Sequence, residues 1–189
     1  MKKTTFVFVL LFSVFVLGTP SFAATVWLDE VISFDQPTGS YTSHNDPTTA
    51  LGPDDDNFVS IDIPETLVLA FTDNSALDDT GYDLRIREYG NDSSHAFVYG
   101  SKNGIDWTFL IDAIGAGNRT DVFIDLQDSG LGYVNYLKFE GRDNKGGSPG
   151  FDLDAVEALN SGPPVPVPSA IWLLGYILAS ILGWHACCA

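Results

Sequence analysis

The chain has 189 residues, which suits one domain plus targeting segments, and 45% of them are apolar, which is enough for a hydrophobic core. Acidic residues number 25 against 9 Lys and Arg, which gives a formal net charge of −16. Such a surface repels phosphate backbones, so we expect no nucleic-acid partner. It favours solubility, and it also attracts cations such as calcium, which prefers carboxylate oxygens.

The N-terminus has the three parts of a secretory signal peptide. Two lysines form a positive region, an apolar run follows, and small residues occupy the −3 and −1 positions of a cleavage site. We predict a signal peptide over residues 1–23 that is cleaved between Ala23 and Ala24. An uncleaved anchor is the alternative, which the small-residue site disfavours.

Nine short runs in the middle of the chain predict β-strands, and nothing there predicts a convincing helix. In 83–89, Leu84 and Ile86 point one way while Arg85 and Arg87 point the other. Alternation with a period of two residues indicates antiparallel sheet with one buried face. The nine runs are 25–34, 57–62, 66–71, 83–89, 95–101, 106–111, 120–126, 133–141 and 151–159.

Two details of these runs predict local structure. The Asn-Gly pair at 103–104 lies between 95–101 and 106–111, and it tolerates the positive φ of a type I′ turn, so the two runs are expected to form a hairpin. In 133–141 the alternation is imperfect. This indicates either a bulge or a Lys138 whose apolar stem covers the sheet surface.

The number and length of the strands predict an all-β fold over residues 24–160. A β-sandwich is expected, with a jelly roll as the favoured form and an immunoglobulin-like sandwich as the alternative. Both cysteines, Cys187 and Cys188, lie at the C-terminus. The domain must therefore be held by its core, with a metal as a further source of stability.

No catalytic motif is recognisable in the body of the chain. His44 and His95 are its only histidines, and neither belongs to a nucleophile or metal pattern. The segment 73–81 has the composition of a calcium loop, but it fails the EF-hand spacing because Leu77 occupies a ligand position. We therefore predict a protein that is not an enzyme.

Two carboxylates and several aromatic rings are the candidate binding residues. Asp152 and Asp154 stand at i and i+2 of a predicted strand, so they share one face, where they either bind calcium or face water. Aromatic side chains such as Trp27, Tyr89 and Trp107 are available to stack on sugar rings, although core packing explains most aromatics on alternating strands.

The C-terminus predicts a membrane-spanning helix behind a Pro-rich linker at 161–168. From residue 169 to the end there is no Lys, Arg, Asp or Glu, and a helix of that length reaches about 30 Å, the thickness of a bilayer core. Trp172 and Trp184 occupy interfacial positions near its ends. We place the helix at about 169–187. A buried core helix is the alternative, which an all-β domain has no place for.

The lead-in to this helix reads Val165-Pro166-Val167-Pro168-Ser169-Ala170, and with the helix it resembles a PEP-CTERM sorting signal of the VPxPA type over 165–189. That resemblance implies export in a Gram-negative bacterium, processing by an exosortase-like enzyme, and delivery to the cell surface or extracellular matrix. The chain closes with HACCA where that family has a basic cluster. A helix that is never cut would instead anchor the domain permanently in the membrane.

The body resembles galactose-binding-like, discoidin-type jelly rolls. The similar pieces are 50–54, 58–60, 66–71, 83–88, 100–107 and 150–156, in the order of that family. The resemblance implies non-catalytic binding of carbohydrate or another surface ligand, often with structural calcium. We therefore expect adhesion or glycan binding in exopolysaccharide. The alternatives are a structural matrix protein without a specific ligand and a polysaccharide-acting hydrolase.

Overall fold

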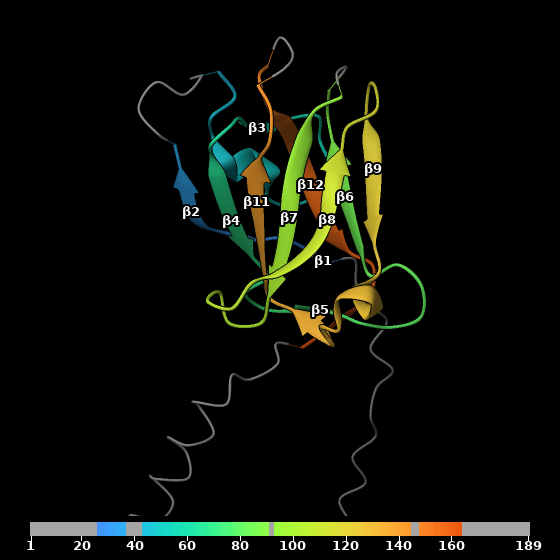
Figure 1. Cartoon of the computed structure of the whole chain (residues 1–189). Coiled ribbons are helices and arrows are strands. Elements are labelled where there is room, and N and C mark those ends of the chain that lie inside the picture. Colours follow the sequence, from blue (N-terminus) through green and yellow to red (C-terminus); the bar gives the residue numbers. More distant parts are fainter. Residues whose placement is uncertain (1–25, 37–42, 91–92, 145–147, 164–189) are drawn as a thin grey trace, which may run out of the picture.

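The computed structural model describes residues 26–36, 43–90, 93–144 and 148–163. Two antiparallel five-stranded sheets pack face to face, and a small three-stranded sheet closes one end (Figure 1). Two short 3₁₀ helices, η1 (Pro47–Ala50) and η2 (Leu126–Ser129), complete the described part of the chain. The prediction of an all-β sandwich is confirmed.

The first sheet has the order β1–β12–β6–β9, and β3 pairs with the same edge of β12 as β1 does. The second sheet has the order β2–β4–β11–β7–β8, and the small sheet has the order β10–β5–β13. The strands of the first sheet are β1 (Val26–Trp27), β3 (Val59–Ile61), β6 (Leu84–Glu88), β9 (Thr120–Ile124) and β12 (Phe151–Ala158). Those of the second are β2 (Glu30–Asp35), β4 (Thr66–Ala70), β7 (His95–Ser101), β8 (Thr108–Ile114) and β11 (Tyr136–Gly141). The small sheet contains β5 (Ser75–Leu77), β10 (Tyr133–Val134) and β13 (Ser161–Gly162).

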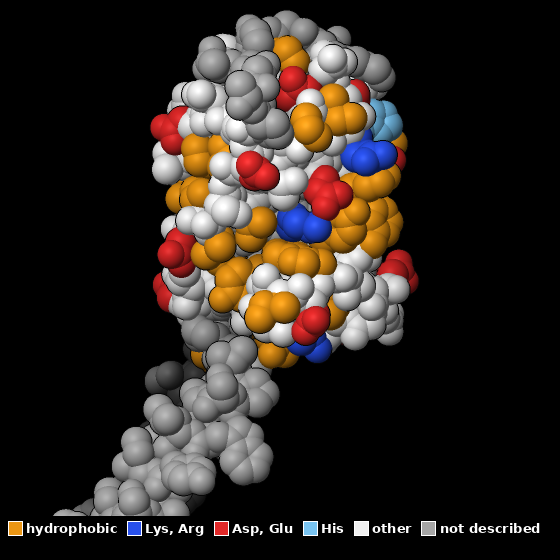
Figure 2. Space-filling model, turned by 60° about the vertical axis from the view of Figure 1, so that its left-hand side comes forward, with side chains coloured by type: hydrophobic (Ala, Val, Ile, Leu, Met, Phe, Trp, Pro, Cys, Tyr) orange, Lys and Arg blue, Asp and Glu red, His pale blue; other side chains and the backbone are white. Residues whose placement is uncertain are grey.

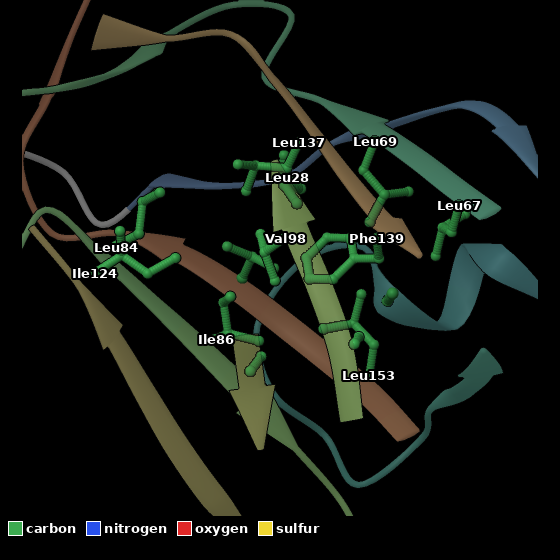
Figure 3. Close-up of a cluster of buried hydrophobic side chains, with 14 of the residues drawn as sticks. Leu28, Leu67, Leu69, Leu84, Ile86, Val98, Ile124, Leu137, Phe139 and Leu153 are labelled. Atoms are coloured by element: carbon green, nitrogen blue, oxygen red, sulfur yellow. The ribbon is translucent and has the colours of Figure 1, made fainter. Parts of the chain in front are cut away.

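The core lies between the two large sheets and is built by the alternation of their strands. Leu84 and Ile86 of β6 are fully buried, whereas Arg85 and Arg87 are half-buried on the outer face, as predicted. In Figure 3 the side chains from the two sheets meet around Phe139 of β11. Burial of these apolar side chains is the main stabilising contribution to the sandwich.

Two predicted strands are each divided between two sheets. The run at 25–34 breaks after β1, because Leu28 N–H donates to Val156 of the first sheet and Asp29 N–H donates to Ala70 of the second. The run at 133–141 breaks at Asn135, which joins β10 to β11. This break accounts for the imperfect alternation, and the bulge was the wrong explanation. The stem of Lys138 does cover the sheet, since its Nζ lies 4.2 Å from the centroid of the Tyr99 ring.

The hairpin between β7 and β8 is confirmed, but its turn differs from the prediction. Gly104 has a φ of 71°, whereas Asn103 does not adopt positive φ, so the turn is not type I′. Instead Asn103 Oδ1 accepts hydrogen bonds from the N–H groups of Ile105 and Asp106, each at 2.9 Å. The side chain replaces the tight backbone turn and closes a longer loop.

The targeting segments lie outside the described residues. They comprise the signal peptide with its Ala23–Ala24 cleavage site, the motif at 165–170 and the helix at about 169–187. Within the described ranges, no helix combines the length and apolar character needed to cross a bilayer.

Candidate ligand-binding site

A stack of three rings lies at one end of the sandwich. His44 and Phe58 stack at 4.3 Å between centroids with an interplanar angle of 16°, and Phe58 and Tyr89 stack at 5.1 Å and 22°. The rings come from three segments: the loop before η1, the residue just before β3 and the residue just after β6. The guanidinium of Arg119 lies 5.6 Å from the centroid of the Tyr89 ring and pairs with Asp56.

The backbone around this stack adopts rarely populated conformations. Across the described ranges, three non-glycine residues have positive φ: His44 at 55°, Asp56 at 69° and Arg119 at 108°. All three belong to the ring stack or to the ion pair beside it. Each such residue costs about 1–3 kcal/mol unless its surroundings impose the conformation, and such residues cluster at functional sites.

Hydrogen bonds to the first sheet hold two of these residues in place. Ser60 N–H in β3 donates to His44 O at 2.8 Å, which attaches the loop before η1 to the sheet. Asp56 N–H donates to Asp154 Oδ2 at 3.3 Å, which fixes the loop before Phe58. The ring stack therefore sits on a backbone tied to β3 and β12.

Beside the stack the surface forms a hollow of about 210 Å³. It is lined by residues 44–46, Thr49 and residues 56–58. Asp46 is the N-cap of η1, and its Oδ1 accepts hydrogen bonds from Thr48 N–H at 3.0 Å and Thr48 Oγ1 at 2.7 Å. The hydroxyl bond and then the N–H bond hold the pKa of Asp46 below its ordinary value. The hollow thus combines aromatic side chains, carboxylates and amides.

The predicted metal ligands lie beneath this end of the sandwich and are buried. Asp152 is 6% exposed and Asp154 is 1% exposed, so neither faces water. Asp152 Oδ1 accepts a hydrogen bond from Ser60 Oγ at 2.6 Å, and Asp154 accepts from the N–H groups of Asp55 and Asp56. The pairing register between β12 and β6 is irregular from Leu153 to Ala155, where Asp154 lies. In this structure the two carboxylates anchor β3 and the 54–57 loop, and calcium binding by them stays a prediction.

The protonation of Asp154 provides a test of this anchoring. Burial, and secondarily the charges of Asp54 and Asp55, raise its pKa above the ordinary 3.8 despite its two hydrogen bonds. When folding raises the pKa of a carboxyl, the folded protein loses stability as the pH rises from the unfolded-state pKa through the folded-state pKa. We expect Asp154→Asn to gain stability relative to the parent protein between acidic and neutral pH, as measured by urea unfolding across that range.

Asp55→Asn is the matched control, with the opposite sign. Hydrogen bonds from the side chain and then the backbone of Asn57 lower the pKa of Asp55, so its carboxylate stabilises the fold above the ordinary pKa of 3.8. This variant should lose stability relative to the parent as the pH rises to about 3.8, which is below the range in which Asp154→Asn gains stability. If the difference in unfolding free energy between Asp154→Asn and the parent protein did not change with pH, the charge of the buried carboxylate would not destabilise the fold.

A cluster of three carboxylates lies elsewhere in the fold, where oxygen atoms of Asp78, Asp83 and Asp125 come within 4.8 Å of one another. Asp83 is fully buried and accepts hydrogen bonds from Leu126 N–H at 2.8 Å, Asp79 N–H at 2.9 Å and Asn160 Nδ2 at 2.9 Å. Asp125 caps η2 by accepting from Gln127 N–H. These bonds join η2, the loop after β5 and the connection between β12 and β13.

Other candidates from the sequence lie on the sheet faces. Trp27 lies under Arg85 on the first sheet, and Trp107 lies 5.4 Å from the Nζ of Lys138 on the second. Figure 2 shows a face on which apolar side chains surround single basic and acidic ones. His95 Nδ1 lies 3.3 Å from Asp112 Oδ1 on the second sheet. Of the aromatics considered for sugar stacking, the structure places Tyr89 in the ring stack, against Phe58, which lines the hollow.

The fold and this site define a β-sandwich with a ligand-binding candidate formed by loops at one end. No family model matches the chain, and no curated protein matches it either. Among solved structures, a fragment of a Bacteroides thetaiotaomicron protein assigned as a chitobiase is similar, with 14% identity and a TM-score of 0.50 over 79% of this chain and 99% of that chain. This similarity shows a shared fold.

Two further structures have lower scores. The C-terminal domain of a Bacteroides fragilis chitobiase has 12% identity and a TM-score of 0.46, covering 70% of this chain and 91% of its own. CBM32-1 from a family 31 glycoside hydrolase of Clostridium perfringens has 14% identity and a TM-score of 0.44, covering 67% of this chain and 92% of its own.

Proposed function

We propose that this chain is an exported, non-catalytic glycan-binding protein with a discoidin-type jelly-roll body, which binds sugar in the hollow beside His44, Phe58 and Tyr89. The observation that carries the proposal is the ring stack next to a hollow of about 210 Å³, with strained backbone at His44 and at the Asp56–Arg119 pair beside it. Phe58 is covered by His44 on one side and Tyr89 on the other, so the ring face open to a sugar is that of the exposed His44. The apolar face of a sugar ring packs there, and the surrounding amides and carboxylates orient its hydroxyl groups.

The carboxylates at the hollow support binding rather than hydrolysis. Glycosidases use two carboxyl groups at a set separation across the scissile bond, one of which exchanges a proton. Here the Oδ1 of Asp46 caps η1 and Asp56 pairs with Arg119. Each carboxylate is engaged in holding a loop. A hydrolase on matrix polysaccharide is the second candidate, and release of reducing ends from purified polymer would establish it.

A glycan array with the purified protein tests the proposal. We expect binding to a defined subset of glycans, with no products released from them. Absence of binding to every glycan, with and without calcium, would leave the structural matrix protein as the better account.

Sorting to the cell surface is the second part of the proposal. It rests on the resemblance of 165–189 to a PEP-CTERM signal and on the signal-peptide pattern of 1–23. An exosortase-like enzyme would cut near the Pro motif and release the domain into the matrix. The mass of the mature protein recovered from cells and from medium reports both ends at once, and a full-length mass in both fractions would contradict the processing.

Calcium is the proposed cofactor, with Asp152 and Asp154 as its ligands. Any ligand that binds the folded state alone stabilises it by mass action. We therefore expect EGTA to lower the melting temperature of the purified protein, and excess calcium to restore it. Asp152→Asn should melt at the same temperature with and without EGTA. If EGTA leaves the melting temperature of the parent protein unchanged, calcium does not stabilise the fold.

A further inference from the structure

We infer that the free edge of β8 is an interaction surface for a second copy of this chain, so that two copies of the second sheet join edge to edge in an antiparallel, two-fold dimer. The chemistry of the strands that end the two large sheets points to this surface. The dimer does not require glycan binding.

β8 ends the second sheet next to β7 (Figure 1) and leaves one side of its backbone unpaired in the part of the chain that the structure describes. Across those residues β8 pairs with β7 alone, and its N–H and C=O groups make no backbone hydrogen bond to another segment. With seven residues, β8 is longer than the other strands that end the large sheets, which are β1, β2, β3 and β9. Such an edge presents the donors and acceptors with which a further strand pairs.

The other edge strands have features that discourage pairing. β2 carries exposed Glu30 and Asp35 and no Lys or Arg, so a second acidic chain meets like charge there. In the first sheet, β9 carries Asp121, which pairs with Arg85 and Arg87. β1 and β3 have only two and three residues. Charged or very short edge strands are common protection against the association of sheets.

β8 lacks this protection. Its sequence TFLIDAI contains one ionisable residue, Asp112, whose Oδ1 lies 3.3 Å from Nδ1 of His95. Both β8 and β2 contain a register shift, so the difference between them lies in their charge. The chain has a formal net charge of −16, so two copies repel each other overall. That repulsion is smallest at a strand with a single carboxylate.

Two exposed apolar side chains make the edge complementary to itself. Phe109 is 49% exposed and contacts the rings of Phe97 and Tyr99 on the outer face of β7. Ile114, at the other end of β8, is 44% exposed and follows the buried Ala113, so it lies on the same face. In an antiparallel pair the start of one strand meets the end of the other, so each Phe109 approaches the partner's Ile114. This match occurs twice in a two-fold pair, which favours a second copy over an unrelated strand.

The interface is small, because each copy contributes one strand and few apolar side chains. Interfaces of this size associate weakly and reversibly. We therefore expect a monomer–dimer equilibrium that depends on protein concentration, and salt should favour the dimer because it screens the repulsion between two acidic copies. Together with the proposed glycan site, a dimer would hold a matrix polymer at two points, which increases avidity.

Sedimentation velocity of the purified protein over a roughly hundredfold range of concentration tests the inference. We expect the dimer fraction to rise with concentration, and to be greater at high salt than at low salt. Hydrogen exchange at high concentration should become slower at the amides of β8 that face away from β7, while the amides of β2 exchange at an unchanged rate. A monomer at every concentration and salt overturns the inference.

Ile114→Lys places a charge on the free edge and should raise the dissociation constant of the dimer at least about tenfold, because two lysines must then lose water at the interface. Ile32→Lys is the matched control. Ile32 is 47% exposed on β2, at the opposite edge of the same sheet, and its replacement changes the net charge equally. That variant should dimerise like the parent protein. Both positions are exposed, so both variants should melt close to the parent protein.

The comparison of the two variants decides whether β8 is the interface. An unchanged dissociation constant in Ile114→Lys overturns the inference. Equal weakening in both variants also overturns it, because association would then depend on overall charge or on another part of the chain. None of these results bears on binding to a glycan array, so the proposed function is tested separately.

Discussion

Phe139→Ala is expected to lower the free energy of unfolding by about 3–5 kcal/mol, the usual cost of truncating a fully buried phenylalanine. Phe139 is 0% exposed, and its neighbours across the second sheet are Leu67 of β4 and Val98 of β7. In Figure 3 its ring also points toward Leu153 of the first sheet. Removing the ring therefore opens a cavity between the two sheets.

Urea unfolding followed by tryptophan fluorescence measures this change in free energy. In a thermal melt, the melting temperature should fall by on the order of 10 °C. Phe109→Ala is the matched control. Phe109 is 49% exposed and makes edge contacts with Phe97 and Tyr99, so its loss should cost no more than about 1 kcal/mol. Equal losses in the two variants would contradict the placement of the core.

Phe58→Ala is expected to weaken glycan binding at least about tenfold, because truncating a central aromatic anchor removes most of the energy of a small site. Phe58 is the middle ring of the stack, so its loss separates His44 from Tyr89 and removes part of the wall of the hollow. Phe58→Tyr retains the ring and should retain most of the binding. Isothermal titration with the best glycan from the array gives both affinities.

The control for this substitution is Phe123→Ala. Phe123 is 41% exposed and packs against Tyr82 at 5.3 Å, so it forms a comparable aromatic pair on the first sheet that does not line the hollow. It should leave the affinity unchanged. If Phe58→Ala binds as well as the parent while melting at the same temperature, the ring stack is not the binding site.

Several strands could be predicted from the sequence because their buried and exposed residues alternate. The pattern of 83–89 sets which side of β6 is buried, and the same holds for β7 and β11. The strands that escaped prediction are β5 and β13, which are too short for a period to show. Their pairing depends on residues distant in sequence, since Ser161 pairs with Ala76.

The candidate site could be predicted only in part. Tyr89 was a candidate for stacking, but no sequence pattern links it to His44 and Phe58, which approach it only after β3 and β6 join the first sheet. Positive φ at Asp56 agrees with the tolerance of aspartate for that region, whereas nothing in the sequence marks His44 or Arg119. The sequence could have predicted the capping role of Asp46, because Pro47 follows it and proline favours the first helical positions.

The most direct test of the account is a nuclear magnetic resonance titration of the labelled protein with its best-binding glycan. We expect the resonances of His44, Phe58, Tyr89 and the loop at 54–57 to shift, while those of Phe97, Phe109 and the rest of the second sheet stay in place. Changes confined to the outer face of the second sheet, or no change at a glycan concentration that saturates binding, would contradict the placement of the site at the end of the sandwich.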